Sequence, residues 1–491
     1  MEVDIGLGNA EGACAPRPSR DETCAASELV PVHRGGAYAN GRMAQREYLR
    51  TLSHLRGAVR YSIEHGARHG GVVGPKPGSI VSMAAPVFVL GGSQTDFSRN
   101  YAREGKTLFD AIGEAVAGAL RDTELEPEAI GSAHVGNFCG ELFTGQGQLG
   151  GALAIVEPRL YGVPAMRHEA ACASGGIAVL SAMAEIEAGR YDCVLVVGAE
   201  MERNVSGAEC AKHLASAAWV GHEGQNARYV WPFMFSEIAA EYERRYGLSY
   251  VHLAAIAKKN LQNAKRNPLA QTRSWTYDDG SFTEDDAKNP IVEGRIRRQD
   301  CGQVTDGATA IVLASATFAE AWAKRHDARV SAIPRILGWG HRTVQLGLAE
   351  KLSRSRDEPL VFPHVRRTID DAFRRAGIPD VHALSAIETH DCFTTSEYMA
   401  IDHFGLTPPG QSYRAIESGE LLFGGKLPMN PSGGLIGGGH PVGATGVRMV
   451  LDASKQVAGK AGETQVEGAN RVGTLNIGGS TTTTVAFVVG T

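Results

Sequence analysis

The 491-residue chain lacks several features that would place it in a special class of protein. Its eight cysteines include no CxxC pair, so neither a zinc-ligand spacing nor a disulfide framework is present. No apolar run approaches the length of a membrane span. The net charge of −5 argues against general nucleic-acid binding, and the hydrophobic share of 43% is that of an ordinary globular chain. The 60 glycines follow no period, which excludes a fibrous protein.

Both ends of the chain also lack targeting signals. The start, Met1-Glu2-Val3-Asp4, has no charged and apolar secretory pattern, and the last residues, up to Thr491, contain no peroxisomal Ser-Lys-Leu. We therefore expect a cytoplasmic protein with reduced thiols. Residues 1–82 mix Gly, Ala, Pro, Arg and His without a sustained pattern. Two interpretations stay open for them: a disordered extension, or a start assigned upstream of the real one at Met83.

After Met83 the sequence repeats one order of elements. An amphipathic helix and a strand are followed by a turn of small residues, a second helix and a second strand. The first copy comprises residues 107–120, 130–136, 172–176, 177–188 and 193–198, and the second comprises residues 365–376, 384–390, 437–440, 442–457 and 472–477. Such a duplication predicts two similar α/β halves packed against each other.

Residues 204–300 interrupt the first copy with helical stretches and polar loops, which indicates an inserted, mostly helical region. We expect an N-terminal half over residues 84–330, including this insertion, and a C-terminal half over residues 331–491. In that arrangement Cys172 and His440 occupy equivalent places, each at the start of a central helix. Two helix N-termini would then converge on one site.

Cys172 lies in Glu169-Ala170-Ala171-Cys172-Ala173-Ser174-Gly175-Gly176, directly before the predicted helix. The free N–H groups and the dipole of a helix N-terminus favour a thiolate there. The pKa of a free cysteine, about 8.5, can fall to roughly 3.5–7.5 in such a place. Because the thiolate is the nucleophile, Cys172 is a candidate covalent catalyst. A buried structural cysteine is the alternative.

Three further stretches could supply the base, the acid and the donors that acyl transfer needs. His440 lies in a Gly-rich turn before Pro441, where glycine allows close approach of the backbone. His390 and Cys392 belong to His390-Asp391-Cys392-Phe393, at the end of a predicted strand. Asn476-Ile477-Gly478-Gly479-Ser480 is a strand end with bare backbone, for which a simple turn is the alternative.

These four stretches, in this order and spacing, resemble the thiolase superfamily from about residue 84 to the C-terminus. His390-Asp391-Cys392-Phe393 stands where most thiolases carry Asn-Glu-Ala-Phe, and this variant resembles the sterol-carrier-protein-type thiolases. Most thiolases place a second catalytic cysteine in a Cys-x-Gly motif near the C-terminus. This chain has Asn476-Ile477-Gly478 there, and the resemblance implies that Cys392 supplies the second thiol.

The resemblance implies a thiolase fold: two duplicated halves with mixed five-stranded sheets, layered α-β-α-β-α, and an inserted loop domain over about 204–300 that holds CoA. It implies cleavage of 3-ketoacyl-CoA by CoA, or the reverse Claisen condensation, as in acetyl-CoA acetyltransferases and the thiolases of fatty-acid β-oxidation. Cys172 would carry the acyl group, His440 would accept its proton and Cys392 would move the proton at the α-carbon. His390 would stabilise the enolate oxygen, and the N–H groups of Cys172 and Gly478 would form the oxyanion hole.

The resemblance further implies CoA and acyl-CoA as substrates, no metal or organic cofactor, and a homodimer or homotetramer. Arg295, Arg297 and Arg298 are candidates for the CoA phosphates, with a solvated basic face as the alternative. Two other functions stay open, because fold does not settle function. One is a different enzyme of this fold: a decarboxylating condensing enzyme, or a retro-aldolase with a small OB-fold partner. The other is a non-catalytic acyl-CoA- or lipid-binding protein.

Overall fold

The computed structural model describes residues 85–491, within the compact unit Met83–Thr491. Both interpretations of residues 1–82 therefore lie outside the described residues. One nine-stranded mixed sheet organises the described part, in the order β3-β2-β4-β7-β1-β8-β11-β10-β9. Its strands are β1 (Val87–Gln94), β2 (Ser132–Gly136), β3 (Ala165–His168), β4 (Cys193–Glu200), β7 (Gly307–Ala314), β8 (Arg335–Thr343), β9 (Ala386–Thr389), β10 (Arg471–Gly478) and β11 (Thr483–Gly490).

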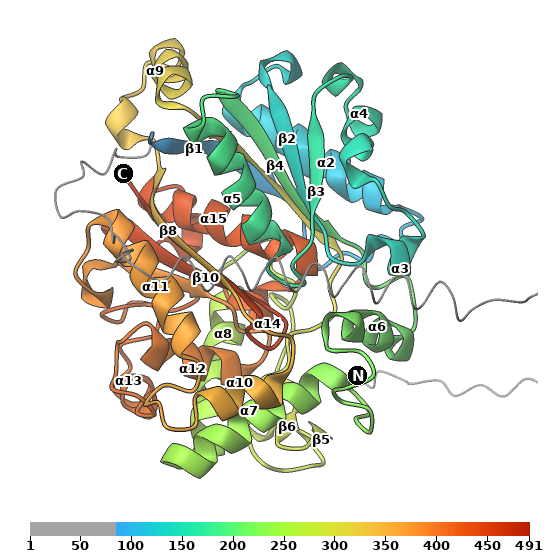
Figure 1. The fold of residues 1–491 in the computed structure, drawn as a ribbon, viewed down its shortest axis with the longest axis vertical. Helices are drawn as coiled ribbons and strands as arrows, with labels where there is room; N and C mark the ends of the chain where they lie inside the picture. The colour runs from blue at the N-terminus through green and yellow to red at the C-terminus, as the bar shows by residue number, and fades with distance from the viewer. Residues whose placement is uncertain (1–84) are drawn as a thin grey trace, which may run out of the picture. The chain divides into compact units, whose positions relative to one another are not determined.

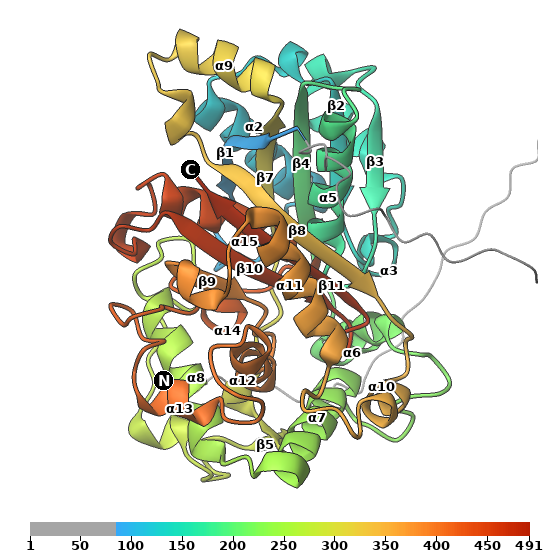
Figure 2. The ribbon, with the colours of Figure 1, turned by 60° about the vertical axis from the view of Figure 1, so that its left-hand side comes forward.

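The sheet divides into the two expected halves, which share a short junction. Strands β1 to β7 belong to the first half and β8 to β11 to the second, and β1 pairs with β8 only at Val87–Ile336 and Phe88–Arg335. Helices α5 (Ser174–Glu187) and α15 (Thr445–Val457) pack against each other between the halves, as Figures 1 and 2 show. Helix α2 (Leu108–Thr123) covers the first half and α11 (Pro363–Ala376) covers the second. The result is the predicted α-β-α-β-α order of layers.

The second half has four strands rather than the expected five. The extended segment around Met429 takes the fifth place beside β9, but it forms a single bridge, between Ile387 and Met429. The N–H of Ile387 donates to the carbonyl of Pro428, and the N–H of Asn430 donates back to Ile387. Pro428 has no N–H to continue the ladder backward. Forward, the N–H of Thr389 donates to the Asn430 side chain and that of Ser432 to the Glu388 carboxylate, so the pairing ends there.

Glycine allows the two central helices to cross in backbone contact. A Cβ on Gly175 would lie 2.8 Å from the carbonyl oxygen of Gly443, and one on Gly446 would lie 2.1 Å from the nitrogen of Gly176. Any side chain here would force the helices apart. Because the crossing is at their N-terminal ends, it brings the segments before both helices, with Cys172 and His440, to one place.

The inserted region is mainly helical, as expected. It contains α6 (Gly207–Leu214), α7 (Val230–Tyr246) and α8 (Tyr250–Ala264), and a small hairpin of β5 (Ile291–Glu293) and β6 (Ile296–Arg297). Helices α7 and α8 pack against α12 (Thr394–His403), and α8 also packs against α14 (Gly434–Gly438). Their apolar residues join those of the second half in one core, so the insertion covers the loops that carry His390 and His440.

The remaining helices lie at the periphery and complete the described part. They are α3 (Gly140–Thr144), α4 (Ala152–Val156), α9 (Ala316–Arg325), α10 (Leu348–Arg354) and α13 (Tyr413–Glu417). Among the described residues, none of the helices is long and apolar enough to cross a bilayer.

Candidate active site

A cavity of about 100 Å³ lies where α5 and α15 begin, and it contains three of the five predicted site residues: Cys172, Cys392 and His440. The other residues that line it are Phe138, Glu202, Leu214, Ala217, Trp231, Phe235, Gly302, Gln303, Val304, Phe393, Val442 and Gly479.

Three stretches far apart in sequence bring their reactive atoms together in this place. The sulfur of Cys172 and one ring nitrogen each of His390 and His440 lie within 4.8 Å of one another. The two imidazole rings are perpendicular, with centroids 5.2 Å apart. His390 is 1% exposed and lies behind the cavity wall. The predicted convergence of two helix N-termini is therefore present.

The backbone before the nucleophile adopts a strained conformation. Ala171 has a φ of 50°, in the left-handed region that residues with a Cβ rarely adopt. Such strain gathers at functional sites, where the surrounding structure enforces it. Here the N–H of Ala173 donates to the carbonyl of Ala170, and the N–H of Ser174 donates to Ala171. This tight turn fixes Cys172 two residues before α5.

The Cys172 thiol is not the low-pKa thiolate that its place before a helix predicts. Burial raises the pKa of Cys172 to about 12. The N–H groups of Gly479 and Cys172 act in the opposite direction but are weaker. The expected lowering of the pKa was wrong because desolvation exceeds the effect of the helix N-terminus. Cys172 therefore needs a base that removes its proton during attack.

His440 has the hydrogen-bonding partners of such a base. Its Nδ1 lies 2.6 Å from Oγ1 of Thr445, whose hydroxyl donates to the carbonyl of Pro441. Nδ1 therefore carries the hydrogen, and Nε2 has a free lone pair. Burial and, secondarily, the charge of Arg448 lower the pKa of His440 to about 3, which keeps the imidazole neutral. The N–H of His440 also donates to Thr305 Oγ1, which fixes the backbone.

His390 has the opposite tautomer, set by Asn476. The Nδ2 of Asn476 donates to the carbonyl of Cys172 at 2.9 Å, which fixes the orientation of the amide. The same Nδ2 lies 3.4 Å from Nδ1 of His390, so Nδ1 is the acceptor and Nε2 carries the hydrogen. Burial and then the neighbouring His440 lower the pKa of His390 well below its usual value. His440 thus presents a base and His390 a donor.

Two contacts hold Cys392 in place, one at its backbone carbonyl and one at its sulfur. Its carbonyl accepts the N–H of Gly302, and its sulfur lies 3.7 Å from Ser396 Oγ. Burial raises the pKa of Cys392 well above that of a free thiol. The preceding Asp391 caps α14, since its carboxylate accepts the N–H groups of Leu435 and Ile436. One motif therefore positions both a second thiol and the turn that leads to His440.

Gly478, the expected oxyanion donor, is the last residue of β10. Gly479 lines the catalytic cavity, and its N–H approaches the Cys172 sulfur. Gly478 lines an adjoining cavity, where a Cβ on it would lie 2.2 Å from the carbonyl oxygen of Ala170. The oxyanion role of Gly478 stays a prediction, and the N–H of Gly479 is a second candidate donor.

Two domain descriptions match this chain: "Thiolase, N-terminal domain" over residues 87–275 and "Thiolase C-terminal domain-like" over residues 348–491. An acetyl-CoA acetyltransferase of Methanothermobacter thermautotrophicus is 31% identical over 395 residues, which is 80% of this chain and 96% of the relative. The chain belongs to the thiolase family. Human sterol carrier protein 2 is 30% identical over 409 residues, covering 81% of this chain and 71% of the relative.

Solved structures share this thiolase fold at low identity. The Ltp2-ChsH2(DUF35) aldolase has a TM-score of 0.64 at 19% identity, covering 83% of this chain and 98% of that chain. Human mitochondrial 3-ketoacyl-CoA thiolase has a TM-score of 0.56 at 17% identity, covering 84% of this chain and all of that chain. Different chemistries are named on this one fold, so the activity follows from the site and not from the fold.

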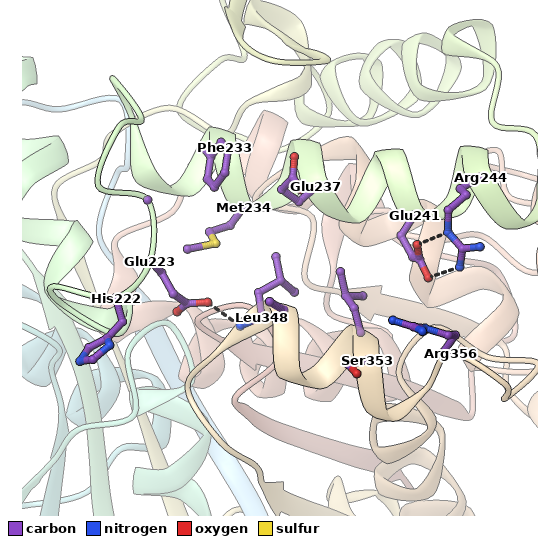
Figure 3. Close-up of a pocket in the computed structure, with 13 residues that line it drawn as sticks. His222, Glu223, Phe233, Met234, Glu237, Glu241, Arg244, Leu348, Ser353 and Arg356 are labelled. Carbon is purple, nitrogen blue, oxygen red and sulfur yellow. Dashed lines mark hydrogen bonds and ion pairs between the residues drawn. The ribbon is translucent and has the colours of Figure 1, made fainter.

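A larger groove of about 740 Å³ lies between α7 and α10 (Figure 3). The residues with which α7 lines it do not include Trp231 and Phe235, which α7 contributes to the catalytic cavity. Phe233, Met234 and Leu348 form its apolar wall. At one end Arg244 pairs with Glu241 at 2.7 Å. None of its lining residues is a cysteine, and its one histidine, His222, has no thiol beside it. The smaller cavity is therefore the candidate active site of this thiolase-family chain.

The three arginines proposed for CoA phosphates differ in their surroundings. Arg297 is buried, pairs with Asp286 and donates to the carbonyl of Asn289. Its guanidinium group is therefore not available to bind a phosphate. Arg295 pairs with Glu243. Arg298 is exposed and donates to a backbone carbonyl, and it remains a candidate.

Sequence reasoning missed Thr445 and Glu202, and it placed Asn476 at a strand end without assigning it a role. Thr445 has no pattern that could have indicated its role. Glu200 and Glu202 were detectable, because two carboxylates directly follow a wholly apolar strand that ends beside Cys172. The carboxylate of Asp306 shapes the backbone beside the site, since it accepts three peptide N–H groups, those of Tyr101, Glu202 and Arg203.

Proposed function

We propose that this protein is an acyl-CoA C-acyltransferase of the thiolase type. It cleaves 3-ketoacyl-CoA with CoA, or runs the reverse Claisen condensation, through an acyl-enzyme on Cys172. The observation that carries the proposal is the approach of the Cys172 sulfur to the nitrogens of His390 and His440, all within 4.8 Å, beside Cys392 in one cavity. A nucleophile, a base, a donor and a second thiol are the groups that this reaction needs.

In the first half-reaction, the sulfur of Cys172 attacks the 3-keto carbon while its proton moves to Nε2 of His440. The N–H groups of Cys172 and of Gly478, or its neighbour Gly479, stabilise the resulting oxyanion. The C2–C3 bond then breaks, and its electron pair forms the enolate of acetyl-CoA. The N–H of His390 stabilises the enolate oxygen, and the Cys392 thiol protonates the α-carbon. Acetyl-CoA leaves a shortened acyl group on Cys172 and a thiolate on Cys392.

In the second half-reaction, the Cys392 thiolate takes the proton of the incoming CoA thiol. The CoA sulfur attacks the acyl group, and Cys172 leaves and recovers its proton from His440. Every proton is returned, so the steps use no metal or redox cofactor. Because a thiol and two imidazoles are also donors that zinc accepts, the assay includes a chelator, which should leave the rate unchanged. A covalent intermediate predicts ping-pong kinetics.

The test measures CoA-dependent consumption of 3-ketoacyl-CoA by the wild type and by Cys172→Ala. We expect turnover that the variant abolishes. The same samples are offered a 3-hydroxyacyl-CoA without CoA and a malonyl thioester. Cleavage of the hydroxy substrate would favour the retro-aldolase function, and loss of CO₂ from the malonyl thioester would favour a condensing enzyme. Tight acyl-CoA binding with no reaction would favour a binding protein. Each of these outcomes would replace the proposal.

A further inference from the structure

Glu202 places a carboxyl group in the wall of the catalytic cavity, where the reaction as described does not use it. It lies just beyond the end of β4, is 2% exposed, and lines the cavity together with Cys172 and His440. It is the one acidic residue among the described residues that do so. Most of the remaining wall is apolar: Phe138, Leu214, Ala217, Trp231, Phe235, Val304, Phe393 and Val442.

The carboxyl group of Glu202 has acceptor contacts but no charge partner. Its Oε1 accepts the N–H of Val442 at 2.9 Å. Within residues 85–491, no Lys, Arg or His nitrogen lies within ion-pairing distance of it. Glu200, two residues earlier at the end of β4, is a second buried carboxyl. Burial and, next, the charge of Glu200 raise the pKa of Glu202 well above its usual value. The side chain is therefore a neutral acid with an O–H to donate.

We propose that Glu202 determines the acyl specificity of the site: it donates a hydrogen bond to an oxygen on the acyl chain. The favoured substrates are then 3-ketoacyl-CoA esters whose short chain carries a hydroxyl or keto group, and plain alkyl chains of equal length are disfavoured. This inference rests on the proposed function. A plain chain would displace water from the cavity and leave the O–H of the neutral carboxyl group without an acceptor, whereas an oxygenated chain would accept it.

The test compares kcat/KM for 3-ketohexanoyl-CoA with that for its 4-hydroxy and 5-hydroxy counterparts. We expect the wild type to prefer at least one hydroxylated chain by about tenfold, the scale of one hydrogen bond in a site that excludes water. Glu202→Gln keeps a donor and should keep the preference. Glu202→Leu should bring the ratio to about one, because it removes the donor. The ratio does not depend on the fraction of folded enzyme, so a destabilised variant remains informative.

Glu200→Gln is the matched control. Glu200 is also buried, but its carboxylate accepts the N–H groups of Phe138 and Gly443 and does not line the cavity. This variant should keep the wild-type ratio. The proposal is overturned by equal values for all chains in the wild type, by a preference that Glu202→Leu retains, or by a preference that Glu202→Gln loses.

Intact-mass measurements distinguish failure of the proposed function from failure of the Glu202 inference. If no 3-ketoacyl-CoA is turned over, the proposed function fails. The Glu202 inference is then judged by the rate at which butyryl-CoA and 3-hydroxybutyryl-CoA acylate Cys172. Faster acylation by the hydroxylated chain, lost in Glu202→Leu, supports it. Equal rates, or acylation by neither, overturn it.

Discussion

Replacing Thr445 by valine tests whether His440 acts as the base in the tautomer that the structure assigns. Valine has nearly the same shape as threonine but lacks the oxygen that lies 2.6 Å from Nδ1 of His440. Thr445 is fully buried, so water cannot take its place. The N–H at Nδ1 then has no acceptor, which costs about 1–3 kcal/mol, or the ring changes tautomer and loses its free lone pair at Nε2.

A cost of this size lowers the rate of Cys172 acylation by roughly 5- to 150-fold. The measurement is the rate of acyl-enzyme formation from acetyl-CoA, followed by rapid quenching and intact mass. Thr445→Ser is the matched control, because it keeps the hydroxyl and should stay within a few-fold of the wild type. Acylation by Thr445→Val at the wild-type rate would refute the assignment, as would an equal loss in both variants.

Four further predictions follow from the same contacts. Cys392→Ser should keep acylation of Cys172 by acetyl-CoA but slow 3-ketoacyl-CoA cleavage by about 10²–10⁴-fold, measured as separate half-reactions; equal effects on both would contradict its role. Asn476→Leu removes the donor that fixes the His390 tautomer and should lower kcat by about 10²–10³-fold with little change in KM; an effect on KM alone would argue against it. Lys259→Met removes the ammonium group that lies 2.6 Å from the buried Glu397 carboxylate. The free energy of unfolding, measured by urea titration, should fall by about 3–5 kcal/mol. An unchanged midpoint of urea unfolding would refute this. Burial lowers the pKa of His364 from 6.5 to about 4, so the unfolded chain takes up a proton first as the pH falls. The free energy of unfolding should therefore decrease by roughly 3 kcal/mol between pH 6.5 and 4. His364→Gln should lose that part of the decrease.

The sequence predicts most of the architecture because the central elements have strong periodic patterns. The helix expected from Thr107 to Leu120 is α2, with Thr107 as its cap, and the one expected from Val365 to Ala376 is α11. Strand β3 was missed because its four residues have no buried face of their own and lie at the sheet edge. The expected fifth strand of the second half does not extend past Pro428, because proline has no N–H for strand pairing. An argument from sequence duplication does not take such local breaks into account.

The sequence predicted which residues meet at the site more accurately than it predicted the ionisation of Cys172. Cys172, His390, Cys392 and His440 meet as expected, because helix starts and strand ends at one edge of a duplicated sheet converge. The expected low pKa of Cys172 was wrong, since residues of the inserted region such as Trp231 and Phe235 help to bury its thiol. The roles of Asn476 and Thr445 depend on contacts between single atoms, which spacing along the chain cannot indicate.

The most direct test of the central claim is the detection of the acyl-enzyme. Wild type, Cys172→Ala and Cys392→Ser are each mixed with a 3-ketoacyl-CoA and with acetyl-CoA, quenched in acid, and analysed by intact mass and peptide mapping. The account predicts an acyl group on the peptide that contains Cys172 in the wild type, the same adduct from acetyl-CoA in Cys392→Ser, and none in Cys172→Ala. Turnover without any adduct, or an adduct that persists in Cys172→Ala, would contradict it.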